Sequence, residues 1–157
     1  MFNQIIVKIL LPIASSWAEK QERLIGRVGV PLPAEFVVVA KRIGIVHPER
    51  VRLLTVEKVP LPLPAFLRRV GEAKGWISPS IGGMTLRYGI FIRSDCWGDR
   101  HLLVHELVHT MQYERMGGFR SFLKLYLREC ISPGYPNGPL EQEAKRLAHQ
   151  IAGSRNA

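Results

Sequence analysis

Two histidines, His105 and His109, lie within a stretch from Asp99 to Met116 whose apolar residues recur at helical spacing. Residues four apart share one face of a helix, so both imidazoles can reach a single metal ion. Glu106 points about 100° around the helix from His105, where its carboxylate can reach a metal-bound water. His-Glu-x-x-His on a helix is the zinc-binding arrangement in which the glutamate acts as general base. The motif therefore predicts a helix here and a divalent metal site, with zinc as the ion.

A pattern with two free positions also occurs by chance in proteins that bind no zinc, so its surroundings matter. One side of the expected helix carries the apolar residues Leu103, Val104, Leu107 and Met111. The two histidines fall on a different side, with His101 and Gln112 one turn either side of them. One face can therefore pack while the other binds a metal, which favours the metal site over coincidence.

Length and charge set broad bounds. At 157 residues the chain is expected to form a single domain over residues 1–157. Its 22 Lys and Arg against 13 Asp and Glu give a net charge of +9. The basic residues are scattered and accompany no nucleic-acid motif, so a solvated basic surface is favoured over attraction to nucleic acid or anionic membrane.

The pattern of apolar, turn and β-branched residues predicts an α+β chain dominated by helices. Helices are expected at Ile5–Arg27, Ala34–Ile43, Ala65–Lys74, Asp99–Met116, Phe119–Ile131 and Leu140–Ala152. Strands are expected at Val51–Val59 and Thr85–Arg93. Asp99 is a plausible N-cap for the motif helix, and Gly117-Gly118 is expected to end it.

The first helix and the cysteines bear on location. The apolar run Ile5–Ala14 is interrupted by Lys8 and is too short to span a bilayer. It reads as the start of an amphipathic helix, for which contact with a membrane surface or a partner is open. Cys96 and Cys130 form no disulfide framework and no C-x-x-C pair, which fits a reducing, cytoplasmic setting.

A catalytic zinc ion usually takes three protein ligands, and the motif supplies two. The residues after His109 contain neither the glycine nor the third histidine of an H-x-x-G-x-x-H continuation. The remaining common solution is a glutamate on a later helix, and Glu141 and Glu143 are the candidates. Both flank the apolar stripe of that helix at about 80°, so helical geometry leaves them tied. Each could equally be a solvated carboxylate in a helix first turn.

With these residues the chain resembles the glutamate zincins, zinc metallopeptidases with H-E-x-x-H on one helix and a ligand glutamate on the next. Glu141-Gln142-Glu143-Ala144 matches their E-x-x-A pattern, and this resemblance favours Glu141 as the third ligand. Lys145 stands where an aspartate is frequent, so the partner of a ligand histidine must come from elsewhere. The resemblance covers Thr85 to Ala152, a minimal bacterial zincin-like core, whereas residues 1–80, expected to be largely helical, resemble no family.

The resemblance implies a mostly helical fold with a small antiparallel or mixed sheet beside the motif helix. It implies a zinc-dependent metallopeptidase in which His105, His109 and Glu141 hold Zn²⁺ and Glu106 is the general base for a zinc-activated water. The substrate would be a peptide or protein, hydrogen-bonded along an edge strand for which Thr85–Arg93 is the candidate. Tyr113 and Tyr135 are candidates for stabilising the oxyanion, although packing is the commoner role for such tyrosines.

Two other functions remain open. One is a zincin-like binding or regulatory module that cleaves nothing. The intact Glu106 argues against this module, because a site without catalysis needs no base. The other is a basic protease associated with DNA or membrane, for which the scattered charge is weak support. The sequence predicts no oligomeric state.

Overall fold

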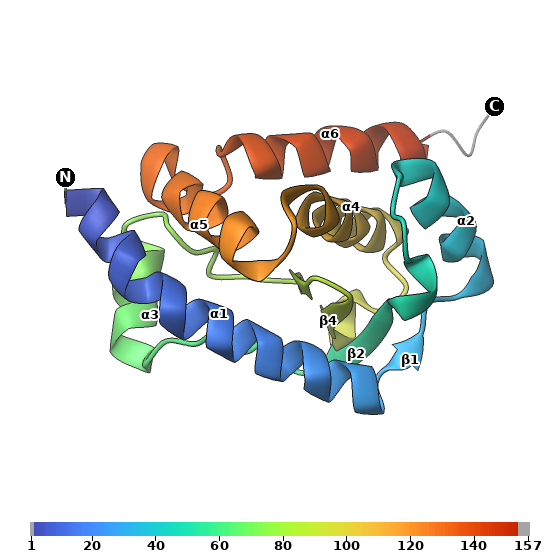
Figure 1. The fold of residues 1–157 in the computed structure, drawn as a ribbon, viewed down its shortest axis with the longest axis horizontal. Coiled ribbons are helices and arrows are strands. Elements are labelled where there is room, and N and C mark those ends of the chain that lie inside the picture. Colours follow the sequence, from blue (N-terminus) through green and yellow to red (C-terminus); the bar gives the residue numbers. More distant parts are fainter. Residues whose placement is uncertain (1, 154–157) are drawn as a thin grey trace.

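The computed structural model of the protein describes residues 2–153. Its helices are α1 (Phe2–Val28), α2 (Ala34–Ile43), α3 (Ala65–Ala73), α4 (Arg100–Met116), α5 (Phe119–Glu129) and α6 (Pro139–Gly153). Its strands are β1 (Val30–Pro31), β2 (Arg52–Val56), β3 (Gly83–Leu86) and β4 (Gly89–Arg93). Within this part of the chain the strands form one mixed sheet in the order β1-β2-β4-β3 (Figure 1). The expected α+β class, with helices predominating and a small mixed sheet, is confirmed.

Local sequence explains most of the helix ends. The Asp99 side chain accepts a hydrogen bond from Leu102 N at the start of α4, and Gly117 ends α4 with a φ of 80°. This left-handed conformation suits glycine, which has no Cβ. Gly44 ends α2 in the same way, with a φ of 104°. The helix expected to reach Ile131 stops at Glu129, where a short π-helical turn over Cys130–Gly134 begins.

The single strand expected over Thr85–Arg93 is wrong, because the chain forms a hairpin there. β3 and β4 pair antiparallel, and the turn between them places Arg87 at a φ of 59°. The turn reverses the alternation, so Leu86 lies on the same side of the sheet as Phe91, not on the side of Ile90. β4 is an inner strand, parallel to β2, and β3 alone forms this edge of the sheet.

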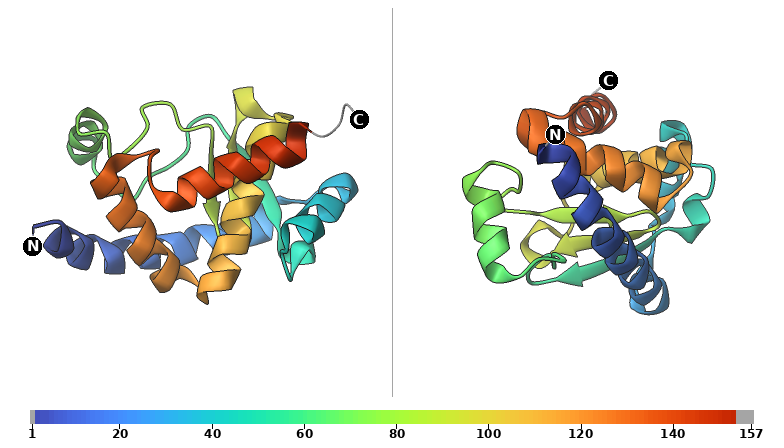
Figure 2. Two further views of the ribbon diagram at one scale, coloured as in Figure 1. Left: turned by 90° about the horizontal axis from the view of Figure 1, so that it is seen from above. Right: turned by 60° about the vertical axis from the view of Figure 1, so that its left-hand side comes forward.

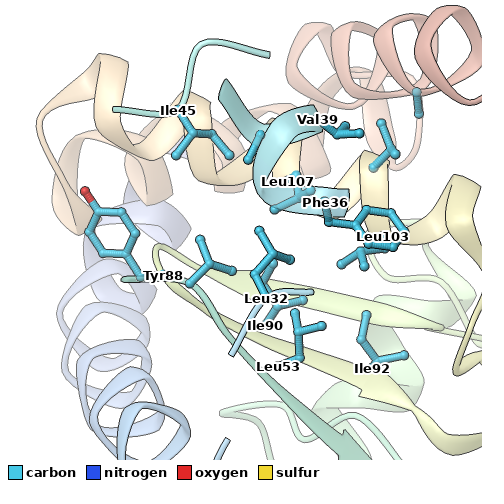
Figure 3. Packing of buried hydrophobic residues seen from close by; sticks show 14 residues of the cluster. Leu32, Phe36, Val39, Ile45, Leu53, Tyr88, Ile90, Ile92, Leu103 and Leu107 are labelled. Atoms are coloured by element: carbon cyan, nitrogen blue, oxygen red, sulfur yellow. The ribbon is translucent and has the colours of Figure 1, made fainter. Parts of the chain in front are cut away.

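Each face of the sheet is covered by helices. Figure 3 shows Leu53, Ile90 and Ile92 pointing from β2 and β4 toward α2 and α4, where they meet Phe36 and Leu107. On the opposite face, apolar side chains of β3 and β4 pack against α1 and α5. Residues of α4 contribute to both hydrophobic clusters, so α4 is packed on two sides.

Two elements lie against α4 and determine what its remaining surface meets. α6 packs across α4, as Figure 1 and the view from above in Figure 2 both show. The edge strand β3 runs beside α4 on another side. No helix within residues 2–153 is both long enough and apolar enough to cross a membrane.

Candidate metal centre

His105 and His109 converge on one point beside α4. Their ring centroids are 4.8 Å apart at a steep angle, and their Nε2 atoms are 3.1 Å apart. His109 is buried and His105 is half-buried. The i,i+4 spacing of the motif thus brings two ring nitrogens together in a largely dry position.

Glu141 of α6 completes a triangle with these histidines. Its Oε2 lies 3.2 Å from His105 Nε2, and its Oε1 lies 3.3 Å from His109 Nε2. Among the described residues, His105, His109 and Glu141 form a group whose ligand atoms all lie within 4.8 Å of one another. The structure therefore brings together the three residues that the sequence and the resemblance pointed to as ligands.

The donor set and its spacing fit a small divalent cation. Two imidazoles and one carboxylate are a common protein ligand set for zinc. Zinc–ligand bonds of about 2.0–2.1 Å in a tetrahedron put ligand atoms about 3.3 Å apart, close to the spacing seen here. Glu141 Oε2 is also buried, and its contact with His105 Nε2 at 3.2 Å does not have hydrogen-bond geometry. A bound cation would give that oxygen a well-directed partner.

The pKa shifts of His109 and Glu141 show that this cluster stabilises positive charge at the histidines. Burial opposes a charge on the His109 ring, but hydrogen bonding and Coulombic attraction from Glu141 outweigh it and raise the pKa of His109 to about 9. Burial also works against ionisation of Glu141, yet His105 and His109 hold the pKa of that carboxyl well below its usual range. The carboxylate therefore stays ionised at neutral pH and favours a cation at the histidines.

Gln112 holds His109 from behind. Its amide nitrogen donates to Leu140 O at 3.0 Å and to Glu143 Oε2 at 2.8 Å, so its oxygen faces His109 Nδ1, 2.8 Å away. An amide oxygen only accepts, so Nδ1 carries the hydrogen and Nε2 is the nitrogen left to bind a metal. Gln112 thus takes the place left open by Lys145. The signal in the sequence was its i,i+3 spacing from His109.

Glu143 has a different environment from Glu141. Arg115 binds its carboxylate through two bonds, Nη1 to Oε1 at 2.9 Å and Nη2 to Oε2 at 2.8 Å. Among the described residues, its link to His109 runs through Gln112. The near tie between the two glutamates in helical angle is therefore resolved by position, with Glu141 at the histidines and Glu143 in a bracing ion pair.

Glu106 lies on the side of α4 that faces β3. Thr85 Oγ1 is 2.6 Å from Glu106 Oε2 and 2.9 Å from the Glu106 carbonyl oxygen. A Cβ at Gly83 would lie only 2.8 Å from Glu106 Oε1, so glycine is what lets the carboxylate approach the strand. The edge strand therefore positions Glu106, and neither Gly83 nor Thr85 was singled out for this role from the sequence.

Three tyrosines near the site differ in environment. Tyr113 stacks on Phe122 with ring centroids 3.8 Å apart and is a core residue, as the packing interpretation expected. Tyr126, which was not singled out from the sequence, donates its hydroxyl to Glu141 Oε1 at 2.6 Å. Tyr135 lines a small cavity with Tyr126 and Glu141, and burial, followed by Coulombic repulsion from Glu141 and Glu106, raises its pKa. Of the two tyrosines named as candidates from the sequence, Tyr135 is therefore the one that lines a cavity with Glu141.

His101 lies outside this cluster and is exposed on the first turn of α4. Cys96 and Cys130 are both free thiols, as expected.

No protein-family model matches this chain, and comparisons with curated proteins and with solved structures found no match. The function must therefore be inferred from the site itself.

Proposed function

We propose that this protein is a zinc-dependent metallopeptidase. The observation that carries the proposal is the buried meeting of His105, His109 and Glu141, while Glu106, the residue after His105, is held by the edge strand. The chemistry of this donor set fits zinc better than magnesium or calcium, which prefer oxygen ligands alone.

The chain would hold the metal through His105 Nε2, His109 Nε2 and the Glu141 carboxylate. A zinc ion bound there would supply Lewis-acid activation of a water molecule and of the substrate carbonyl. Gln112 keeps the hydrogen of His109 on Nδ1 and so presents Nε2 to the metal. Tyr126 and the two histidines keep the Glu141 carboxylate in one orientation.

Proton transfer would fall to Glu106. Thr85 engages its Oε2 and Gly83 leaves room beside its Oε1, so the carboxylate is held in one place, where it would accept a proton from the attacking water and pass it to the leaving amine. Such a base must remain fixed within hydrogen-bond reach of its partners, and burial between α4 and β3 restricts its rotamers.

The edge strand offers a site for an extended substrate. Within residues 2–153, β4 is the one strand that pairs with β3, so the outer side of β3 can pair with an added strand. A peptide added to that side would run past Thr85, whose side chain touches Glu106. The same strand would then hold both the base and the scissile peptide, which supports peptide hydrolysis over hydrolysis of a small soluble substrate.

The test combines metal analysis with cleavage of a broad peptide library. Zinc-loaded protein is expected to cleave, chelated protein is not, and Glu106→Gln is expected to keep zinc while losing cleavage. Glu57→Gln, at an exposed glutamate away from the site, is the matched control and should cleave normally. Zinc binding without cleavage of any peptide would instead indicate a binding module, and loss of zinc from Glu106→Gln would show that Glu106 is a ligand.

A further inference from the structure

Helix α3 exposes apolar side chains to solvent and covers charged ones, the opposite of an ordinary surface helix. Phe66 and Val70 are 66% and 45% exposed, and Leu67 is also exposed. The charged pair Arg68 and Glu72, bonded at 2.9 Å, is more covered, with side chains 18% and 27% exposed. A helix on a globular protein normally turns its apolar side inward. The exposed apolar side of α3 is therefore typical of a binding surface.

The first half of α1 carries a second exposed apolar row. Ile5, Ile9 and Ile13 are spaced four residues apart, so they line one side of the helix, and Ile9 is 62% exposed. Val7 and Leu11 are buried on the other side and anchor α1 to the protein. Figure 1 and the left view of Figure 2 place this half of α1 and α3 at the same end of the molecule. We call the exposed apolar residues of this end the end surface: Ile5, Ile9, Ile13, Phe66, Leu67 and Val70.

The charges near the end surface are mostly positive. Lys8, Arg69 and Lys74 are exposed beside the apolar residues, and α1 has no acidic residue before Glu19. The whole chain carries a net charge of +9. Amphipathic helices with basic flanks bind at the boundary between headgroups and acyl chains of anionic bilayers.

The exposure of the end surface also fits a bilayer. Its apolar side chains lie open on two helices, and exposed apolar side chains flanked by basic residues can enter the boundary of a lipid layer. We propose that the end surface binds the surface of an anionic membrane, with its apolar side chains at the acyl boundary and Lys8, Arg69 and Lys74 near lipid phosphates. This binding does not depend on the metal centre.

Vesicle co-sedimentation of the full chain tests the proposal. Vesicles of phosphatidylcholine with about 30% phosphatidylglycerol are expected to bind the protein more tightly than vesicles of phosphatidylcholine alone, and about 1 M salt should weaken this binding. A Phe66→Ser, Val70→Ser variant should lose about tenfold or more in partitioning, because both side chains would leave the acyl boundary. Val38→Ser, at an exposed apolar residue of α2 toward the opposite end of the molecule, is the matched control and should bind as the unchanged protein does.

Charge variants provide a second, independent measure. Arg69→Glu with Lys74→Glu should reduce binding to anionic vesicles by about tenfold, while Lys41→Glu with Arg42→Glu on α2 should have a smaller effect. Chelation of metal, or Glu106→Gln, should leave vesicle binding unchanged, which separates this proposal from the peptidase. Equal binding by all variants, or no binding by the unchanged protein, would overturn it. So would sedimentation as a dimer that the Phe66→Ser, Val70→Ser variant abolishes, since a second copy would then cover the end surface.

Discussion

His109 and Gln112, three residues apart on α4, are joined by a hydrogen bond of 2.8 Å from Nδ1 to the amide oxygen. The same amide binds the Leu140 carbonyl, one residue before Glu141. One fully buried side chain therefore orients a histidine and fixes the helix that carries the glutamate. Such an arrangement couples the geometry of the metal centre to the packing of α4 on α6.

Replacing Gln112 should weaken the metal site while every proposed ligand remains. Gln112→Ala is expected to lower zinc affinity about 10–100-fold, the usual effect of losing a partner that orients a ligand histidine. Competition with a chromogenic chelator measures the affinity, and the absorption spectrum of the cobalt-substituted protein reports the ligand geometry. Gln150→Ala, at an exposed position of α6, is the matched control. An unchanged cobalt spectrum and affinity in Gln112→Ala would show that Gln112 only fills space.

The two glutamates of α6 should separate cleanly in metal binding. Glu141→Ala removes a proposed ligand and should lower zinc affinity more than about 100-fold, beyond the effect of a supporting residue. Glu143→Ala should lower it less than about tenfold, because among the described residues the link from Glu143 to His109 runs through Gln112. Titration of the metal-free variants with zinc measures both. A larger loss in Glu143→Ala than in Glu141→Ala would contradict the proposed ligand set.

Adding one methyl group at Gly83 should disturb the base without disturbing the metal. The new Cβ would lie 2.8 Å from Glu106 Oε1 and 3.0 Å from its Cγ, so the carboxylate or the strand must move. Overpacking of this kind typically costs about 1–3 kcal/mol of stability. Gly83→Ala is therefore expected to bind zinc normally but to lose most peptidase activity. Gly26→Ala is the control, since nothing lies within 4 Å of a Cβ there, and equal activity of the two variants would argue against positioning of Glu106 by β3.

The metal-free protein should lose stability as the pH rises from about 6.5 to about 9. The pKa of His109 is raised from 6.5 to about 9, because Glu141 favours the charged ring more than burial disfavours it. The proton on His109 stabilises the fold fully below the unfolded pKa, and this contribution disappears as the pH passes the folded pKa. The loss in the free energy of unfolding should reach up to about 3 kcal/mol. Urea unfolding of chelated protein across this range measures it.

The matched variant for this pH dependence is Glu141→Gln. Without the carboxylate, the group that raises the pKa of His109 is gone, so most of the decline in stability should go with it. A decline of the same size in the variant would mean that another group titrates. Zinc affinity should rise with pH over the same range, because the metal must displace the proton from His109 Nε2.

Local sequence determined the half of the metal centre that lies on α4. Four-residue spacing in a helix brings His105 and His109 together whatever surrounds them, because the period of the helix is set by its backbone. Asp99 and Gly117 likewise set the ends of α4 through capping and left-handed geometry, both of which act within a few residues. These features could be predicted because each depends on neighbours along the chain.

Tertiary structure decided the other half. Glu141 and Glu143 flank one apolar stripe at similar angles, so the direction from which α6 approaches α4 decides which carboxylate meets the histidines. The hairpin within Thr85–Arg93 could not be predicted from the sequence either. The alternation of apolar residues continues across its tight turn, and the residue at positive φ is Arg87, not the glycine that usually signals such a turn. That hairpin makes β3 the edge strand and places Thr85 and Gly83 against Glu106. Contacts between distant segments fix such positions, and no spacing within one segment encodes them.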